Sequence, residues 1–189
     1  MAHKTERQYS MTNRTMTAEA TRNRILQATL ELATEKLTVE IVLVDVAERA
    51  GVTVQTLLRH FGSRKRLFDA AVAAGADQIV SERGSPVGDI GEAVRVVVDH
   101  YESRGDWSIA LLGQEASDER IKDVTGLGKQ VHRDWVHTVF SPQLSEVTAS
   151  ARPGIEDLLA VATDVYTWKL LRRDRGLSRT EVEKRMRYL

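Results

Sequence analysis

The chain has 189 residues, of which 42% are hydrophobic and 29% are charged, and its formal net charge is zero. This length allows one compact domain, or a small head with a medium-sized body. The absence of cysteine excludes disulfides and thiolate chemistry, and no apolar run approaches the roughly 20 residues of a membrane-spanning helix. With only 3 prolines the composition predicts a largely helical protein, and without the apolar core of a signal peptide we expect a cytoplasmic location.

The charges are unevenly distributed along the chain. Residues 1–66 contain 11 Lys and Arg against 7 Asp and Glu, a net charge of +4, whereas residues 67–189 contain 16 against 20, a net charge of −4. A basic first third suits an element that binds a polyanion, attached to an acidic body. The split supports that interpretation but is too small to carry it alone.

The first 17 residues are polar and lack any periodicity, which predicts a disordered arm. This arm is either an uninvolved tail or a basic segment that contacts a polyanion. From about residue 18 to residue 36, apolar residues that include Ile25, Ala28 and Leu32 recur at helical spacing and predict the first helix.

Two short helical patterns follow, separated by a glycine. Leu43, Val46 and Ala50 keep helical spacing, and Gly51 then provides a residue that adopts a left-handed backbone at no steric cost. Thr53 can cap a second helix that ends near Phe61. The pattern therefore predicts a helix, a tight turn and a helix, and Ser63 can cap a further helix that runs to about residue 82.

The second of these helices carries polar side chains opposite its apolar ones. Gln55 suits adenine and Arg59 suits guanine or phosphate in a major groove, while threonine and histidine side chains can donate to phosphates. Cations in the first turn of the next helix are unfavourable there unless an anion is close, the alternative being a solvated surface. The candidate DNA-binding residues are Thr53, Val54, Gln55, Thr56, Arg59, His60, Arg64 and Lys65.

The stretch VAERAGVTVQTLLRHFGSRKRLF resembles the DNA-binding head of the TetR family of bacterial repressors. Four positions depart from the family pattern: Val42 replaces a capping Thr, Gln55 a Gly, Leu58 a phosphate-contacting Tyr, and Arg64 a Lys. The LacI type shares part of the motif, but there it lies at the extreme N-terminus before a large α/β domain, whereas here a full helix precedes it. The positions that match the TetR pattern are Ala47, Ala50, Gly51, Val52, Thr53, Thr56, Leu57, His60, Phe61, Ser63 and Leu67.

In the rest of the chain, the pattern of apolar residues predicts helices separated by short loops. We expect a helix from about residue 90 to Gly105, a shorter one from 106 to 116, and a longer one to Phe140 in which Gly126 and Gly128 indicate a kink or a close approach. Aromatic and polar residues on these helices could line one cavity, as TetR-like bodies commonly enclose a ligand, although plain core is the alternative. These candidate ligand-binding residues are Tyr101, Trp107, Glu115, His132 and Trp135.

The last two helices, from Pro153 to about Arg173 and from Ser178 onward, suggest a subunit interface. The first of them is apolar on two sides and therefore needs two partners, one of which the family resemblance implies to be a second copy of the chain. The spacing of His132 and His137 is poor for a metal site. We find no nucleophile with a paired acid and base, and we predict neither an enzyme nor a cofactor.

These observations predict an all-α protein with three parts: a disordered arm (1–17), a helix-turn-helix DNA-binding head (18–66), and a helical body for ligand binding and dimerisation (67–189). The resemblance implies a repressor that binds a pseudo-palindromic operator as a homodimer and is released by a small-molecule effector. The alternative is a helical ligand- or partner-binding module that no longer binds DNA specifically.

Overall fold

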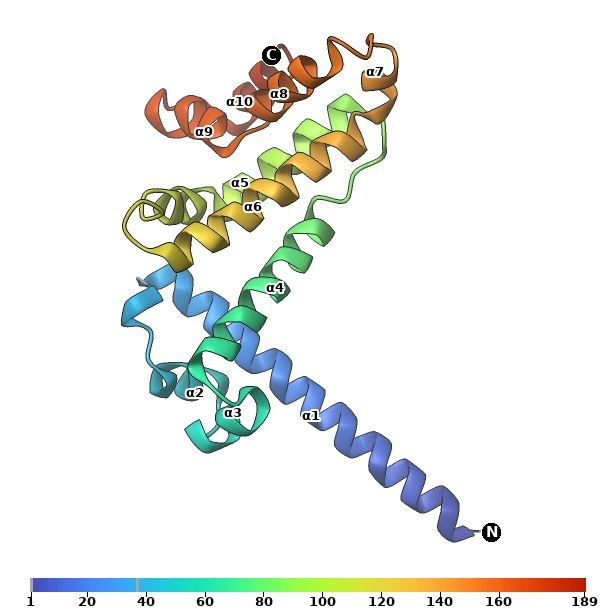
Figure 1. The fold of residues 1–189 in the computed structure, drawn as a ribbon, viewed down its shortest axis with the longest axis vertical. Helices are drawn as coiled ribbons and strands as arrows, with labels where there is room; N and C mark the ends of the chain where they lie inside the picture. Colours follow the sequence, from blue (N-terminus) through green and yellow to red (C-terminus); the bar gives the residue numbers. More distant parts are fainter. Residues whose placement is uncertain (1, 37) are drawn as a thin grey trace. The chain divides into compact units, whose positions relative to one another are not determined.

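The computed structural model describes residues 2–36 and 38–189, with side chains for residues 16–33, 35–36, 38–119 and 121–189. Every regular element within these ranges is helical (Figure 1), which confirms the predicted all-α class. None of the described helices combines the length and the apolarity needed to cross a bilayer. The chain divides into two compact units, Met1–Gly75 and Ala76–Leu189, and the boundary falls inside helix α4 (Arg64–Glu82). The functional division after residue 66 stays a prediction.

The first unit contains α1 (Ala2–Glu35), the short 3-10 helix η1 (Thr38–Glu40), α2 (Leu43–Ala50), α3 (Val54–Phe61) and the first part of α4. Helix α1 begins at Ala2 instead of near residue 18, so the backbone expected to be a disordered arm is helical. The first 35 residues contain neither glycine nor proline, and nothing in them ends a helix. The side chains of Lys4, Arg7 and Arg14 lie outside the described residues.

The turn between α2 and α3 has the geometry that its residues predict. Gly51 adopts a left-handed backbone with φ of 64°, and its N–H donates to carbonyls of the last turn of α2. The Thr53 hydroxyl accepts a hydrogen bond of 3.1 Å from the Thr56 N–H and so caps α3. Leu57 and Phe61 on α3 are buried in one apolar cluster with Ile25 of α1. These buried residues fix the orientation of α3 within the head.

The second unit contains α5 (Ile90–Leu112), α6 (Glu119–Val139), α7 (Ser141–Ser145), α8 (Arg152–Ala162), α9 (Val165–Lys169), the π-helical η2 (Leu170–Asp174) and α10 (Arg179–Met186). Helices α5 and α6 lie side by side, with α9 and α10 packed on α5 and α8 packed on α6 (Figure 1). The buried apolar residues form two separate clusters, one between α5 and α9–α10 and one between α5, α6 and α7. Trp135 packs against both clusters.

The prediction that a helix ends near Gly105 is wrong, because α5 continues through it to Leu112. Gly105 is a packing site rather than a helix end: a Cβ built there would lie 2.4 Å from the ring of Trp168. Trp168 is fully buried and donates its indole N–H to Glu102 over 3.0 Å. The glycine therefore makes room for an aromatic side chain that comes from a distant part of the sequence.

The close approach expected at Gly126 and Gly128 is also absent from the described residues. Helix α6 runs through both residues without interruption, and a Cβ at either position would meet no atom within 4 Å. Both residues are exposed. These glycines therefore lower the helix propensity of α6 without any packing reason in the described residues.

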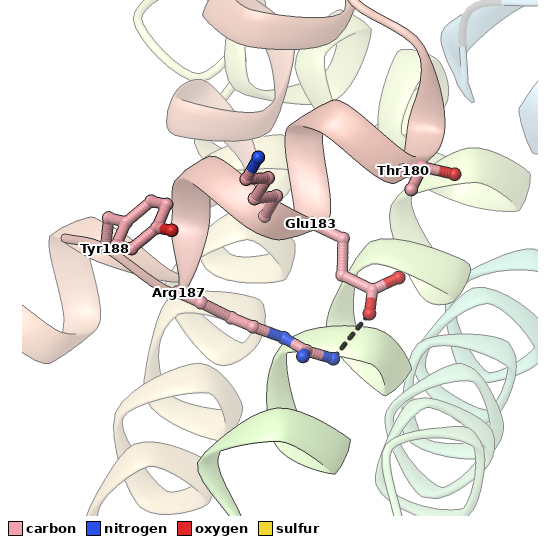
Figure 2. Close-up of a pocket in the computed structure, with 5 residues that line it drawn as sticks. Thr180, Glu183, Arg187 and Tyr188 are labelled. Atoms are coloured by element: carbon pink, nitrogen blue, oxygen red, sulfur yellow. Dashed lines mark hydrogen bonds and ion pairs between the residues drawn. The ribbon is translucent and has the colours of Figure 1, made fainter.

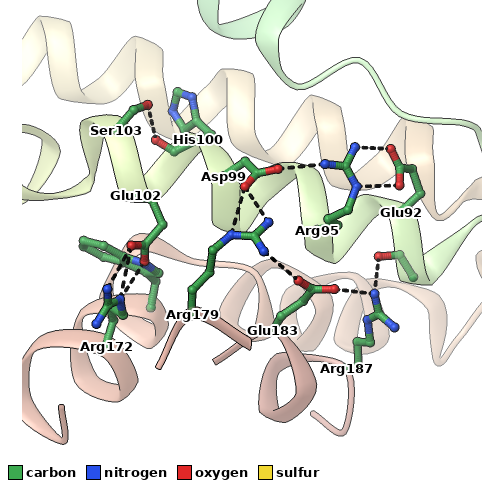
Figure 3. A network of polar contacts seen from close by, with 12 residues as sticks. Glu92, Arg95, Asp99, His100, Glu102, Ser103, Arg172, Arg179, Glu183 and Arg187 are labelled. Atoms are coloured by element: carbon green, nitrogen blue, oxygen red, sulfur yellow. Dashed lines mark hydrogen bonds and ion pairs between the residues drawn. The ribbon is translucent and has the colours of Figure 1, made fainter. Parts of the chain in front are cut away.

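Ion pairs connect the C-terminal elements to α5 (Figure 3). Arg172 of η2 donates to both carboxylate oxygens of Glu102, and Arg179 of α10 donates to Asp99. The exposed pair of Arg179 and Asp99 contributes only about 0–1 kcal/mol. The larger contribution comes from Val182 and Met186, because burying each of these side chains contributes about 1.5–3 kcal/mol.

We predict that Gly126→Ala and Gly128→Ala each raise the free energy of unfolding by up to about 1 kcal/mol, since alanine has a higher helix propensity and neither new methyl group meets a neighbour. Gly105→Ala, the same chemical change on a helix of the same unit, should destabilise the protein because its methyl group would overlap Trp168. Urea unfolding of the three variants measures both effects. A stabilising Gly105→Ala would contradict the assigned packing.

Candidate nucleic-acid interface and effector site

Helix α3 presents two polar side chains on the face opposite its buried residues. Gln55 and Arg59 are one turn apart and both are exposed, while Leu57 and Phe61 are buried. Neither the Gln55 amide nor the Arg59 guanidinium makes a hydrogen bond or ion pair within the described part of the chain. All their donors and acceptors are therefore available to a partner outside the molecule.

Four other predicted residues flank this pair. Thr53 and Thr56 are joined by a hydroxyl–hydroxyl hydrogen bond of 3.0 Å at the start of α3. Val54 packs partly against the core of the head, and His60 is half-buried beside Phe61, with their ring centroids 6.4 Å apart. The structure thus brings these residues together around one end and one face of α3, and their contact with DNA stays a prediction.

Arg64 and Lys65 are neighbours in sequence but differ in their surroundings. The Arg64 guanidinium donates to the carbonyls of Thr38 and Ile41 and lies over the Phe68 ring at 4.4 Å. Its donors therefore tie α4 to the segment before α2. Lys65 is exposed and pairs with Asp69 one turn later. Of the two cations, Lys65 is the one that extends into solvent.

Three of the five predicted ligand-binding residues converge in the body. Tyr101 of α5 and His132 and Trp135 of α6 surround Arg83, the residue that follows the end of α4. His132 stacks on Trp135 at a ring separation of 5.9 Å and an interplanar angle of 17°. Glu115 lies apart from them and accepts hydrogen bonds from Lys129 and Thr125, and Trp107 is half-buried on α5.

Arg83, His132 and Thr163 form a buried polar layer beside the two apolar clusters of the body. His132 places Nε2 3.1 Å from the Ala160 carbonyl and Nδ1 3.0 Å from Nη1 of Arg83. Because a carbonyl only accepts, Nε2 carries the proton and Nδ1 accepts from Arg83. His132 is therefore neutral in this network.

Two histidines of the body resist protonation. Burial lowers the pKa of His100 to about 3, the Arg83 cation adds to this shift, and Glu82 opposes it. Burial likewise lowers the pKa of His132, again with Arg83 as the next contributor. Both imidazoles are therefore neutral at physiological pH.

Arg83 is the functional candidate that sequence reasoning did not identify. It stands before Gly84, Ser85 and Pro86, a run that predicts an exposed loop, yet its side chain is 6% exposed. No local pattern indicates this burial, because the rings that cover the guanidinium come from residues 18 and 52 positions further along the chain.

A surface pocket on α10 is a weaker candidate for a binding site. Thr180, Glu183, Lys184, Arg187 and Tyr188 line it (Figure 2). Arg187 donates to Glu183 within the pocket, so these two opposite charges already satisfy each other. No group of three or more His, Asp or Glu side chains suited to a metal ion occurs among the described residues.

A capped helix-turn-helix with a free polar face, followed by a helical body, defines the class of helix-turn-helix DNA-binding proteins. Residues 25–71 match a family model described as bacterial regulatory proteins of the tetR family. This match covers the helix-turn-helix and confirms the resemblance of its motif. Comparison with curated proteins gives no match.

Solved structures show that the fold extends beyond the head. A tetR-family transcriptional regulator from Streptomyces coelicolor is 18% identical, with a TM-score of 0.66, over 90% of this chain and 78% of that one. A transcriptional regulator from Rhodococcus sp. Rha1 is 18% identical, with a TM-score of 0.62, over 88% of this chain and 92% of that one. A TetR transcriptional regulator from Rhodococcus sp. RHA1 is 22% identical, with a TM-score of 0.52, over 89% and 93%. The family match of residues 25–71 supports a DNA-binding regulator, and the solved structures show that the rest of the chain shares their fold.

We predict that the body loses stability as the pH falls from 7 to 5. Unfolded histidines take up protons near pH 6.5, whereas a pKa of about 3 keeps His100 neutral in the folded state and the lowered pKa of His132 opposes its protonation there. The unfolded state then binds more protons, so stability falls by up to about 1.4 kcal/mol per pH unit for each histidine. Urea unfolding at several pH values measures the slope.

A His100→Asn, His132→Asn double variant should flatten this slope, and exposed His137→Asn serves as the matched control. The charged groups around the two imidazoles, Glu82, Arg104, Asp164, Arg83 and Arg133, stay unchanged in all variants. A double variant with the wild-type slope would contradict the assignment.

Proposed function

We propose that this protein is a ligand-responsive transcriptional repressor that binds a pseudo-palindromic operator as a homodimer and leaves it when a small-molecule effector binds the body. The observation that carries the proposal is the exposed pair Gln55 and Arg59, without internal partners, on a helix that is capped at its start and buried on its opposite face. Such side chains form the reading surface of helix-turn-helix proteins.

In this proposal α3 enters the major groove. Gln55 donates to and accepts from an adenine edge, and Arg59 contacts guanine or phosphate. Thr53, Thr56 and His60 contact flanking phosphates and set the register. Two copies read half-sites about 34 Å apart, which is one turn of the double helix.

Dimerisation requires a surface that a second copy covers. An exposed apolar stripe follows α8 and the helical segments after it: Leu158 and Val161 are each 63% exposed. Helix α10 is less suited, because its apolar residues Val182 and Met186 are buried in the core of its own chain. We therefore assign the subunit interface to the stripe made of Ile155, Leu158, Val161, Tyr166 and Leu170.

The effector acts through α4 in this proposal, because this helix has residues in both units. A ligand that binds better when the two heads are wrongly spaced shifts the population away from the DNA-bound state, by no more than its differential affinity for the two states. The polar layer beside the end of α4, together with Tyr101 and Trp135, is the candidate site for this ligand.

The alternative is a helical module that binds a ligand or a partner but no specific DNA. Leu58, which stands where the family pattern has a phosphate-contacting Tyr, motivates it. A gel shift with the DNA that flanks its own gene separates the two functions. Phosphate-driven binding weakens about 10³–10⁵-fold between about 50 and 200 mM salt for a protein with 6–10 phosphate contacts, whereas a module without DNA affinity gives no shift at any salt concentration.

We predict that Gln55→Ala and Arg59→Ala each cost about 1–3 kcal/mol of operator binding and relax the preference at one base position. Lys65→Ala should instead weaken binding to operator and unrelated DNA alike, because a phosphate contact carries no sequence information. Gel shifts with operator and scrambled duplexes measure both quantities. Equal losses on both duplexes for all three variants would refute the assigned roles.

Arg64→Ala tests whether a loss of DNA binding can also arise from a loss of stability of the head. Because Arg64 donates to the carbonyls of Thr38 and Ile41, its loss should lower the stability of the head as well as DNA binding. Urea unfolding distinguishes it from Lys65→Ala, which should unfold like the wild type.

We predict that Leu158→Asp and Val161→Asp convert the dimer to a monomer, since each would bury a carboxylate without a partner at the interface. Val87→Asp is the matched control, because Val87 is also more than half exposed but lies in the loop before α5. Sedimentation velocity measures the oligomeric state. A dimer that survives both α8 substitutions would rule out this interface.

A further inference from the structure

Arg83 is a buried cation without a buried anion. Its side chain is 6% exposed, and its guanidinium contacts the neutral His132, the Tyr101 hydroxyl and the faces of the Tyr101 and Trp135 rings, none of which carries a negative charge. Its Nε is buried and has no hydrogen-bond partner. Because burying an unpaired charge is costly, such an arrangement is expected where an absent group supplies the missing charge.

The carboxylates closest to Arg83 in sequence or in electrostatic effect have other partners. Glu82 accepts two hydrogen bonds from Arg104 and a contact from His100. Asp164, which influences the pKa of His132, accepts from the Tyr166 N–H as the cap of α9. Neither forms an ion pair with Arg83.

Other arginines of the body show what Arg83 lacks. Arg172, which is less deeply buried, donates to both oxygens of Glu102 (Figure 3), and Arg104 donates to both oxygens of Glu82. Each of these two guanidinium groups therefore has a carboxylate partner that accepts two hydrogen bonds. Arg83, which is more deeply buried than either, has no such partner among the described residues.

The groups around Arg83 leave no other donor or acceptor to compete for an anion. Tyr101 donates its hydroxyl to the Thr163 carbonyl, Trp135 donates its indole N–H to the Arg83 carbonyl, and Thr163 donates its hydroxyl to the Leu159 carbonyl. The Nε of Arg83 is the buried donor that remains, and the lining beside it is aromatic. This combination of one charged donor with apolar walls is typical of a ligand site.

We propose that the polar layer binds an apolar organic carboxylate, which accepts from the guanidinium of Arg83 at the edge that carries the unpartnered Nε, while its apolar part lies against Tyr101 and Trp135. A carboxylate matches this edge because its two oxygens accept two parallel N–H bonds from a planar guanidinium. The inference rests on the proposed function, and it names the chemical class of the effector.

The position of Arg83 connects this site to the head. It directly follows Glu82, the last residue of α4, and the first part of α4 belongs to the first unit. A carboxylate bound to Arg83 therefore acts on the end of the helix that continues into the DNA-binding head. Binding stabilises whichever position of this helix brings the guanidinium to the ligand.

The experiment compares benzoate with its uncharged analogue benzamide on the full chain. Isothermal titration and tryptophan fluorescence should show saturable binding of benzoate. The affinity for benzamide should be at least about tenfold lower, because the ion-paired hydrogen bonds are lost. Arg83→Gln should weaken benzoate binding about tenfold or more, while Arg133→Gln, an exposed arginine of α6, should bind like the wild type. Arg83→Lys, which keeps the charge without the fork, should fall between them.

Equal binding of benzoate and benzamide by the wild type overturns the site even if Arg83→Gln does not fold. So does wild-type affinity in a folded Arg83→Gln, or the absence of benzoate binding. A protein that binds benzoate through Arg83 but never shifts its flanking DNA refutes the proposed repressor and not the carboxylate site. A protein that shifts this DNA but does not distinguish the two probes refutes the site alone.

Discussion

The burial of Leu57 and Phe61 is the constraint on which the exposed face of α3, and the DNA recognition proposed for it, depend. An eight-residue helix does not form in isolation, because nucleation fixes several residues before the first hydrogen bonds repay that cost. Helix α3 exists because these two side chains enter the core of the head and because Thr53 caps its start. The same two anchors leave no rotational freedom about the helix axis, so Gln55 and Arg59 must face solvent. The buried face of α3 thus stabilises the head, and its opposite face carries the proposed reading surface.

The body follows a different principle. Its buried residues form two apolar clusters instead of one, with a polar layer of Arg83, His132 and Thr163 beside them. A fully apolar layer would be cheaper to bury, since each buried polar group needs its own partner. The neutral tautomer of His132 accepts a hydrogen bond from one donor of Arg83, and the aromatic rings stabilise the charge of Arg83 by cation–π contact. The Nε of Arg83, however, has no acceptor among the described residues. Function explains such an exception better than stability does.

Local patterns predicted the head well and the body less well. Gly51, Thr53 and the spacing of the apolar residues act within a few positions of themselves, so the helix-turn-helix could be read directly from them. Gly105 looked like a helix end because its partner, Trp168, lies 63 positions away, and Gly126 looked like a close approach although nothing approaches it. The convergence of Tyr101, His132 and Trp135 was predictable from helix faces. Their common neighbour Arg83 was not, because burial of a loop cation depends on tertiary packing alone.

In the proposed function, the departures of this head from the TetR pattern change how its affinity for DNA is divided between the phosphate backbone and the bases. Leu58 cannot donate a hydrogen bond, so one phosphate contact that a Tyr provides is lost, and with it some salt-dependent affinity that is equal for all sequences. Gln55 adds an amide where the pattern has no side chain, and it also favours the helix by about 1 kcal/mol relative to Gly. Both changes lower binding to random DNA relative to a site with a suitably placed adenine. In the proposed function, a regulator with this head depends more on the match of its operator, and the proposed dimer would read that match in both half-sites.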